Sequence, residues 1–417
     1  MGASAQRECP LFENTQHLHM KHDIGIFTLT SELHNAEAIA AATKDFLGSL
    51  NIDYDFLDDD YTEYGERPLN LFYVRTGGTE GILKRLLPHL RQQSQTPLYL
   101  LTSGKSNSLA ASMEILSYLK QQGLEGEIVH GNPEFIARRI VKLCTVAKAR
   151  AALKGTHFAA IGEPSDWLIA SQANEPQIRK RLGMELLQIP MQELLDKIAQ
   201  TPLDNNHEPH PNPDIAQALP GAWQIYRALK AIVDRHNLKG FTLRCFDLLT
   251  SVHNTGCLAL AKLNSEGIVA GCEGDVPSML SMAIVKALTG LTGFQSNPAR
   301  IDTETGEMIF AHCTIPFNLI ERYELLTHYE SGIGVGIRGF MSPGPVTIFK
   351  VSGDLQRYFI AEGTLTENLQ QPDLCRTQQL IRLEEAAQAE YFLSNPIGNH
   401  HIIVPGHHRE LLELFMQ

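Results

Sequence analysis

The sequence predicts an α/β protein in which two consecutive doubly wound parallel-sheet domains precede a β-rich, barrel-like C-terminal domain. Two observations carry this prediction. Up to about residue 292, short apolar segments alternate with helical segments of a dozen or more residues, as in parallel sheets with helices on both faces. After about Gly293 the helical signals thin out, and short strand-like segments are separated by Gly- and Pro-containing turns, as in an antiparallel barrel or sandwich.

The first α/β domain is predicted over residues 23–152, after a polar tail at 1–22. Its strands are expected at 23–28, 69–74, 97–101 and 126–130. Its helices are expected at 35–50, 80–92 and 107–122, and a last helix follows the strand at 126–130 and runs to about residue 153. Asn35 is expected to be the N-cap of the first helix. The loops Thr76–Thr79 and Thr102–Ser106 follow strands, at the sheet edge where ligands bind. Thr102–Ser106 lacks the P-loop spacing, so it is either a plain strand-to-helix turn or an anion or substrate loop.

The second α/β domain is predicted over residues 153–292. Strands are expected at 155–161, 186–189 and 240–246, and helices at 191–198, 222–236 and 277–288. Ser165 or Asp166 is expected to cap a helix that follows the first of these strands. Residues 201–220 are rich in Pro, Asn, His and Asp, which predicts an exposed excursion. The C-terminal domain, 293–417, is expected to contain strands at 306–312, 346–351 and 357–361.

Charge and composition exclude several classes of protein. The 417 residues carry 35 Lys and Arg against 47 Asp and Glu, a net charge of −12, with no basic stripe, so a general nucleic-acid binder is not expected. No apolar run reaches the roughly 20 residues that span a bilayer, and the N-terminus lacks the apolar core of a secretory signal. We therefore expect a cytoplasmic protein with no membrane partner.

The cysteines do not predict a disulfide framework or a structural zinc site. Their number, seven, is odd, their spacing is irregular, and no C-x-x-C occurs. Reduced thiols, partly in the core, are the simplest interpretation.

The segment Gly271–Asp275, Gly-Cys-Glu-Gly-Asp, is the first candidate for chemistry. It places Glu273 and Asp275 between an apolar strand and an apolar helix. Helix capping and the helix dipole explain one of these carboxylates comfortably. A desolvated carboxylate at such a position is also suited to acid/base work or metal ligation.

Three further segments supply amide and imidazole groups. Asn297 precedes Pro298, which is most simply a turn. His312 ends a predicted strand and is either a satisfied core residue or a ligand. The segment Asn399–His408 contains two His-His pairs, which form either a surface cluster or part of a site. Carboxylates and imidazoles without paired thiolates suit a divalent metal such as Mn²⁺, provided that the fold brings them together.

At Gly271–Asp275 the sequence resembles the L-fucose isomerase / L-arabinose isomerase superfamily, as a divergent and short member. Those enzymes carry a Glu in an (A/C/T)-E-(G/A)-D turn before an apolar helix that ends in a Gly turn, as in Cys272–Gly293 here. The order of parts also agrees: two α/β domains, a β-rich domain, a His-containing strand and a late His-His pair. The resemblance covers most of the chain in architecture, but in motif only residues 240–316 and 395–408.

The resemblance implies a metal-dependent aldose–ketose isomerase that acts on a monosaccharide through a cis-enediol. It implies Mn²⁺ or another divalent metal, held by Glu273, Asn297, His312 and His401, with the adjacent His400 as an alternative to His401. Glu273 would also be the acid/base, and a homotrimer or homohexamer is expected, in which a neighbouring subunit's first domain closes the pocket.

The departure from the family lies at the second carboxylate. The fucose-type enzymes have Asp at the position of Asn297, 24 residues after Glu273. An amide can bind metal through its carbonyl oxygen but cannot take up a proton as a base does. The missing base could come from one of four carboxylates: Asp302, Glu304, Asp275 or Asp247.

Four residues of the second domain are candidates for contact with the sugar or for its catalysis. Arg244 and Asp247 end the strand that precedes the site and could orient hydroxyl groups or form an ion-paired scaffold. Trp167 and Ser165 could line the cleft, although Trp167 could equally serve hydrophobic packing.

Two other functions remain open from the sequence. A metal-dependent lyase or aldolase on a sugar or sugar acid would also form an enediolate but would break a C–C or C–O bond, and Asn297 favours this alternative. A sugar-binding protein could also use paired α/β domains. Plain, deoxy, phosphorylated and sulfonated sugars are all compatible with the sequence.

Overall fold

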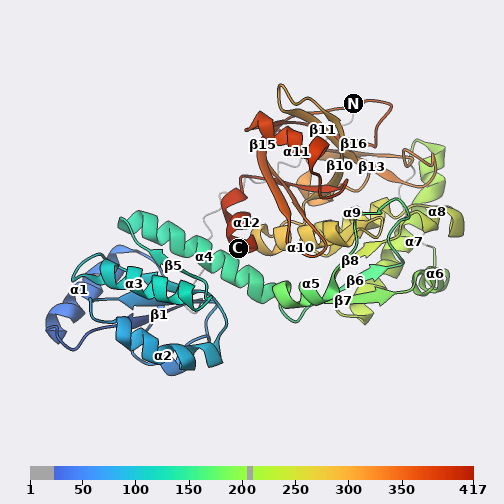
Figure 1. The fold of residues 1–417 in the computed structure, drawn as a ribbon. Helices are drawn as coiled ribbons and strands as arrows, with labels where there is room; N and C mark the ends of the chain where they lie inside the picture. The colour runs from blue at the N-terminus through green and yellow to red at the C-terminus, as the bar shows by residue number, and fades with distance from the viewer. Residues whose placement is uncertain (1–22, 204–209) are drawn as a thin grey trace, which may run out of the picture. The chain divides into compact units, whose positions relative to one another are not determined.

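The computed structural model describes residues 23–203 and 210–417, which fold into two compact units divided between Lys148 and Ala149 (Figure 1). The predicted tail at 1–22, Cys9 within it, and part of the predicted excursion at 204–209 lie outside the described residues. The predicted domain boundaries at 152 and 292 stay predictions.

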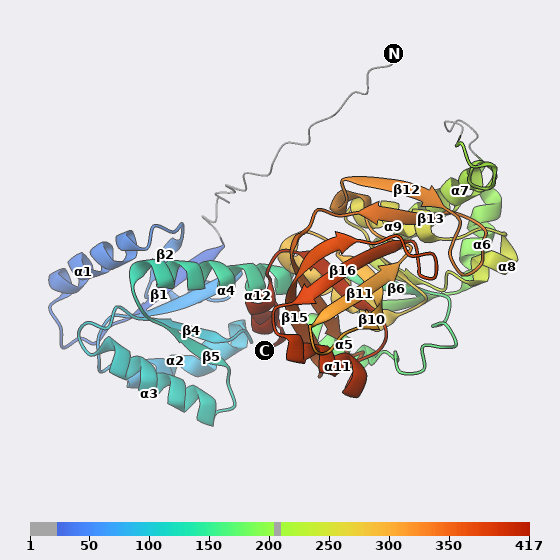
Figure 2. The same cartoon turned by 90° about the horizontal axis from the view of Figure 1, so that it is seen from above.

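The first unit is built on a five-stranded parallel sheet in the order β2-β1-β3-β4-β5. Helices α1 and α4 cover one face of the sheet, and α2 and α3 cover the other (Figure 2). The elements are β1 (Ile24–Leu29), α1 (Ala36–Ser49), β2 (Asp55–Asp58), β3 (Leu69–Val74), α2 (Glu80–Gln93), β4 (Leu98–Leu101), α3 (Ser108–Gln121), β5 (Gly126–Val129) and α4 (Pro133–Leu153). This confirms the predicted doubly wound sheet.

Local signals explain most of these elements. Every residue of β1 and β3 is buried, as expected for strands covered on both faces. The Asn35 side chain accepts a hydrogen bond from Ala38 N and caps α1, as predicted. The sequence did not predict β2, an edge strand of four residues that begins and ends with Asp.

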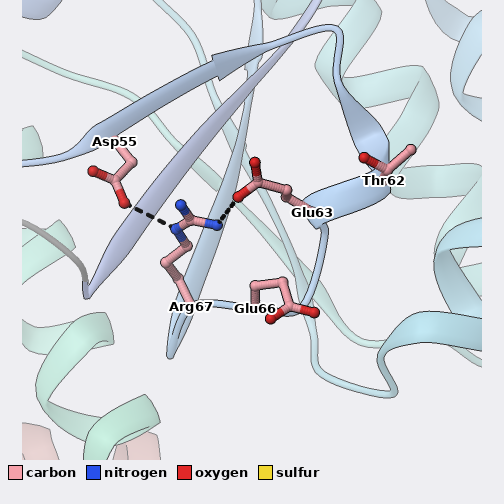
Figure 3. A pocket seen from close by; sticks show the side chains of 5 residues that line it. All are labelled: Asp55, Thr62, Glu63, Glu66 and Arg67. Atoms are coloured by element: carbon pink, nitrogen blue, oxygen red, sulfur yellow. Dashed lines mark hydrogen bonds and ion pairs between the residues drawn. The ribbon is translucent and has the colours of Figure 1, made fainter.

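A cavity of about 450 Å³ opens on the first unit, lined by Asp55, Thr62, Glu63, Glu66 and Arg67 (Figure 3). Arg67 lies between two of its carboxylates, with Nε 2.9 Å from Asp55 and Nη1 2.5 Å from Glu63. One guanidinium thus faces three carboxylates in the cavity wall, and its two ion pairs tie the start of β2 to the segment before β3.

The second unit contains a four-stranded parallel sheet in the order β7-β6-β8-β9. Its strands are β6 (His157–Ile161), β7 (Glu185–Ile189), β8 (Leu238–Leu243) and β9 (Val269–Cys272), and its helices are α5 (Glu175–Leu182), α6 (Met191–Gln200), α7 (Pro213–Arg235), α8 (Asp247–Ser251), α9 (Cys257–Ser265) and α10 (Val276–Thr289). Helices α7 and α9 contact each other, and their apolar residues share one core with the sheet.

The rest of the second unit is a closed antiparallel barrel in the order β10-β11-β16-β15-β14-β17, with a hairpin, β12-β13, beside it. Its elements are β10 (Phe294–Ile301), β11 (Glu307–His312), β12 (Arg322–Leu326), β13 (Gly336–Phe340), β14 (Gly344–Val351), β15 (Tyr358–Asn368), β16 (Thr377–Leu383), α11 (Glu390–Ser394), β17 (His401–Pro405) and α12 (Arg409–Met416). The predicted barrel-like C-terminal part is therefore confirmed as a closed barrel.

Helix α10 joins the parallel sheet to the barrel. It contacts β8 and β9 on the sheet and β14 and β17 on the barrel. Its residues are buried almost all round, which is the pattern of a helix with no solvent face. Asp275 caps its first turn by accepting a hydrogen bond from Ser278 N.

Three expectations about local structure are wrong. Ser165 and Asp166 cap no helix, because the next helix is α5, which Asn174 caps. Part of the predicted excursion is helical, since α7 begins at Pro213 with Asn212 as its N-cap. Asn297 and Pro298 lie inside β10 rather than in a turn, and a register shift near Pro298 accommodates the proline.

Within residues 23–203 and 210–417, no helix combines the length and the apolar character that crossing a membrane requires.

Replacement of Gly240 by Ala is expected to destabilise the second unit. A Cβ at this position of β8 would lie 2.5 Å from Val269 Cβ and 2.8 Å from Phe158 Cε1, so the neighbouring strands would have to shift. We expect Gly240→Ala to lower the free energy of unfolding by about 1–3 kcal/mol, measured by urea denaturation. Gly336→Ala is the control, because a Cβ there meets only ordinary contacts of 3.5 Å or more. Equal losses in the two variants would contradict this account.

Candidate metal centre

Three loops of the second unit meet where the parallel strands end. They follow β6, β8 and β9, at the carboxyl edge of the sheet where ligands bind in α/β proteins. The barrel contributes His312 at the end of β11 and His400, the residue before β17, to the same place. The site therefore draws on both halves of the unit.

The turn between β9 and α10 has an unusual backbone. Glu273 has a φ of 65° and Gly274 a φ of 71°, both in the left-handed region. A Cβ on Gly274 would lie 2.8 Å from Glu163 O, so only glycine fits. The turn is held by hydrogen bonds from Gly274 N to Leu243 O and from Ser165 N to Glu273 O, each 2.9 Å. Such strain in a non-glycine residue is typical of functional sites.

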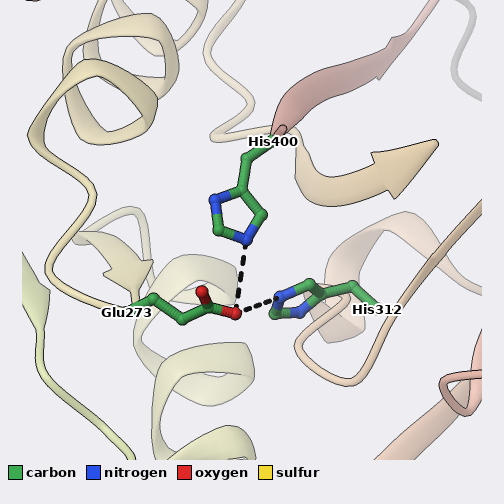
Figure 4. A group of neighbouring side chains, drawn as sticks. All are labelled: Glu273, His312 and His400. Carbon is green, nitrogen blue, oxygen red and sulfur yellow. Dashed lines mark ion pairs between the residues drawn. The ribbon is translucent and has the colours of Figure 1, made fainter. Parts of the chain in front are cut away.

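Glu273, His312 and His400 form a buried group whose ligand atoms all lie within 4.8 Å of one another (Figure 4). Glu273 Oε1 lies 3.4 Å from His400 Nε2 and 3.8 Å from His312 Nε2. His400 is fully buried, and its Nε2 has no hydrogen-bond partner among the described residues. Two ring nitrogens and a carboxylate oxygen thus converge on one point.

The outer atoms of this group are fixed by neighbours. His400 Nδ1 lies 2.8 Å from Asp275 Oδ2, and because a carboxylate accepts, Nδ1 donates and Nε2 is the ring nitrogen that remains to bind a metal ion. His312 Nδ1 lies 2.9 Å from Thr314 Oγ1. Trp167 Nε1 donates to Glu273 Oε2 at 2.6 Å, which leaves Oε1 facing the imidazoles.

The carboxylates and imidazoles of the group shift one another's pKa values. Burial alone would raise the pKa of Glu273, but His312 and His400 hold it well below its usual range. Burial would likewise lower the pKa of His400, yet the Asp275 and Glu273 carboxylates raise it to about 9. A metal ion that binds Nε2 would displace the proton that the two carboxylates favour on this ring.

The donor set fits a divalent ion. One carboxylate and two imidazoles are the ligands of many Zn²⁺, Fe²⁺ and Mn²⁺ sites, and three protein ligands leave positions open for substrate. The donors do not by themselves select one of these metals.

Asn297 lies next to this group in the barrel sheet. In β10, Ser296 pairs with His401 and Asn297 pairs with Ala311, so the register brings Asn297 level with His400. Its Oδ1 is buried and has no hydrogen-bond partner among the described residues. A buried carbonyl oxygen without a hydrogen-bond partner is expected where that oxygen binds a metal ion or another ligand. The metal role of Asn297 stays a prediction.

His401 does not face the group, which favours His400 in the choice between the two neighbouring histidines. Its Nε2 lies 3.2 Å from Tyr391 Oη, its Nδ1 lies 3.1 Å from Asn399 O, and its ring packs against Phe392. Burial and the Lys350 charge lower the pKa of His401 to about 3. The structure groups His400, not His401, with Glu273 and His312.

Arg244 and Asp247 form a scaffold beside the site. Arg244 Nε donates to Asp247 Oδ1 at 2.9 Å, Nη1 donates to Pro164 O at 2.6 Å and Nη2 to Asp166 Oδ1 at 3.1 Å. Arg244 thereby holds the loop that carries Ser165 and Trp167. Ser165 Oγ is buried without a hydrogen-bond partner among the described residues, and its contact with substrate stays a prediction.

Two of the carboxylates considered as the missing base lie outside the group. Asp302 and Glu304 are exposed in one turn, where the Asp302 side chain accepts from Glu304 N. Asp275 is fully buried and already engaged by His400 and Ser278.

Sequence reasoning missed two residues that support the site. Gln295 on β10 accepts from Cys272 N at 2.8 Å, and its Nε2 lies 3.3 Å from Cys272 O, which fixes the backbone just before Glu273. Lys350 on β14 is fully buried beside Asp275. A lysine inside the apolar run Val346–Val351 was a signal that could have found it, whereas nothing in the sequence marked Gln295.

The chain is similar to sulfoquinovose isomerases. It is 23% identical to the enzyme of Priestia aryabhattai over 271 residues, which cover 59% of each chain. It is 25% identical to that of a Clostridium species, strain MSTE9, over 53% of this chain and 51% of the relative. The chain thus spans about half to three-fifths of the length of these curated relatives. No family model matches the chain.

The metal centre is open to a direct test by substitution. We expect Mn²⁺ to bind the chelator-treated protein, and His400→Ala to weaken binding by more than about 100-fold, because loss of a ligand exceeds the 10–100-fold effect of losing an outer-shell partner. Isothermal titration calorimetry measures the affinity. His401→Gln, at the neighbouring position, should leave it within about threefold. Loss of binding in His401→Gln but not in His400→Ala would contradict the assignment.

Proposed function

We propose that this chain is an aldose–ketose sugar isomerase, with Glu273, His312, His400 and Asn297 holding a divalent metal. The buried Glu–His–His group carries the proposal, because it joins a carboxylate suited to proton transfer with ligands for a metal. The similarity to sulfoquinovose isomerases supports both the reaction and a sulfonated aldose, sulfoquinovose, as substrate.

The bound metal would polarise the sugar carbonyl and stabilise negative charge on its oxygen. Glu273 would remove the proton from C2, next to the carbonyl, and return it to C1. The hydroxyl proton of O2 passes to O1, so the intermediate is a cis-enediol and the product a ketose. Trp167 fixes the carboxylate by donating to Glu273 Oε2. Ser165 and Asn297 have buried polar atoms free to meet substrate or metal.

A single carboxylate must both take and return the proton in this scheme. Asn297 cannot act as a base, Asp275 is enclosed, and Asp247 is paired with Arg244. Transfer therefore proceeds on one face of the enediol.

We expect part of the deuterium of a C2-deuterated aldose to appear at C1 of the ketose, measured by NMR. If all of the deuterium is lost to solvent even in the first turnovers, a single base that is shielded from water is contradicted.

Glu273→Gln is expected to lower kcat by about 10²–10⁴-fold in the Mn²⁺-supplied protein, since it removes the proton acceptor. Conversion of sulfoquinovose to its ketose is followed by NMR. Glu304→Gln makes the same chemical change in an exposed turn and should leave kcat unchanged. Retained turnover in Glu273→Gln would reject Glu273 as the base.

The products separate this proposal from its two alternatives. A ketose with no shorter fragment supports an isomerase, whereas shorter products indicate a lyase or aldolase. Tight sugar binding without conversion in the metal-supplied protein indicates a binding protein.

A homotrimer or homohexamer in the cytoplasm completes the proposal. Trp167 is 52% exposed although its Nε1 is bound to Glu273, so a neighbouring subunit could cover it. Light scattering on the purified protein measures the assembly.

A further inference from the structure

Lys350 is the most unusual charged residue of the second unit. It lies in β14 with 0% of its surface exposed, between Phe349 and Val351, which are equally buried. Lysine is almost never fully buried unless its charge is paired, because removing an ammonium from water is costly. Its surroundings must therefore compensate the charge.

The ammonium group reaches the first turn of α10. Lys350 Nζ donates to Ser278 Oγ at 2.9 Å and lies 3.4 Å from Asp275 Oδ2. Ser278 Oγ in turn donates to the same Asp275 oxygen at 2.6 Å. A Cβ on Gly398 would lie within 4.0 Å of Lys350 Nζ, so the lysine also borders the segment that leads to His400.

These contacts continue to the metal group. Asp275 Oδ2, which receives Lys350 and Ser278, also accepts from His400 Nδ1 at 2.8 Å. His400 Nε2 then faces Glu273 Oε1 at 3.4 Å. A continuous path of polar contacts thus runs from a barrel strand to the ligand atoms, and every side chain on it is at least nine-tenths buried.

We propose that Lys350 is a positioning residue, which holds the Asp275 carboxylate so that it orients His400 with Nε2 toward the metal. The inference rests on the metal centre of the proposed function, and it adds a role for a residue that touches neither metal nor substrate. A lysine that only fastens the barrel to α10 would affect folding but not the orientation of His400.

Two serines of α10 offer a matched test. Ser278 and Ser281 are both fully buried and both link α10 to β14. Ser278 bonds to Lys350 and Asp275, whereas Ser281 Oγ accepts from Val351 N and lies outside the path to His400. Both variants lose one buried serine hydroxyl. A difference in Mn²⁺ affinity between them is therefore due to the contacts of Ser278 with Lys350 and Asp275.

We expect Ser278→Ala to weaken Mn²⁺ binding by about 10-fold, the lower end of the effect of an outer-shell partner, and Ser281→Ala to leave the affinity unchanged. Calorimetry measures Mn²⁺ binding without sugar, and the melting temperature is recorded for each variant. Equal Mn²⁺ affinity in folded Ser278→Ala, Ser281→Ala and wild-type protein would overturn the positioning role.

Removing both buried charges provides a second test. Lys350→Met leaves Asp275 without its cation, but Lys350→Met with Asp275→Asn leaves no unpaired charge and should melt close to the wild type. We expect the double variant to bind Mn²⁺ about 10–100-fold more weakly, because an amide no longer enforces the proton on His400 Nδ1. Wild-type affinity in the folded double variant would overturn the whole path, because neither Lys350 nor Asp275 would then be needed to orient His400.

The metal affinity of the wild-type protein separates this inference from the proposed function. Wild-type protein that binds none of Mn²⁺, Zn²⁺ and Fe²⁺ would overturn the metal centre itself. Wild-type protein that binds Mn²⁺ while the variants bind equally well would overturn only the role of Lys350. Neither outcome depends on which sugar is converted.

Discussion

The turn between β9 and α10 is the constraint on which the second unit depends. It must reverse the chain at the sheet edge, present Glu273 and start a helix that has no solvent face. Two consecutive left-handed residues achieve this, at a cost of order 1–3 kcal/mol for the non-glycine Glu273. Backbone hydrogen bonds to Leu243 and Ser165 offset the strain, and they fix the carboxylate relative to the strands on either side.

The site exists only where the sheet and the barrel meet. The α/β half supplies Glu273 and Asp275, and the barrel supplies His312, His400 and Lys350. Helix α10 fills the space between the halves, so its apolar packing and the polar path at its N-terminus stabilise the same interface. Glu273, His312 and His400 therefore come together only when both halves of the unit are folded against α10.

Much of the fold followed from sequence pattern. Strand β3 is apolar apart from Asn70 and buried on both faces, and Asn35 caps α1, so composition and cap chemistry were sufficient there. Helix α9 escaped prediction because nearly all its residues are buried and no amphipathic period results. Asn297 was misplaced because Asn-Pro ordinarily marks a turn, whereas a shift in the β10 ladder admits this proline.

The site was predictable in part. Glu273 could be chosen because a carboxylate in an apolar setting is unusual, whereas His312 could equally be a core residue and was chosen on the family resemblance. His400 and His401 could not be separated, because adjacent residues near the start of a strand point in opposite directions and the sequence does not say which faces inward. The supporting contacts of Gln295 and Lys350 join segments far apart in the chain and depend on the tertiary register.

The contact between Trp167 and Glu273 has a practical consequence. The chain has two tryptophans, and this indole donates directly to the carboxylate while its ring packs against Phe246. Any cation or sugar that draws the carboxylate away changes the electric field and the polarity around the indole. The intrinsic tryptophan fluorescence of the unlabelled protein is thus expected to report the binding of a cation or a sugar at Glu273.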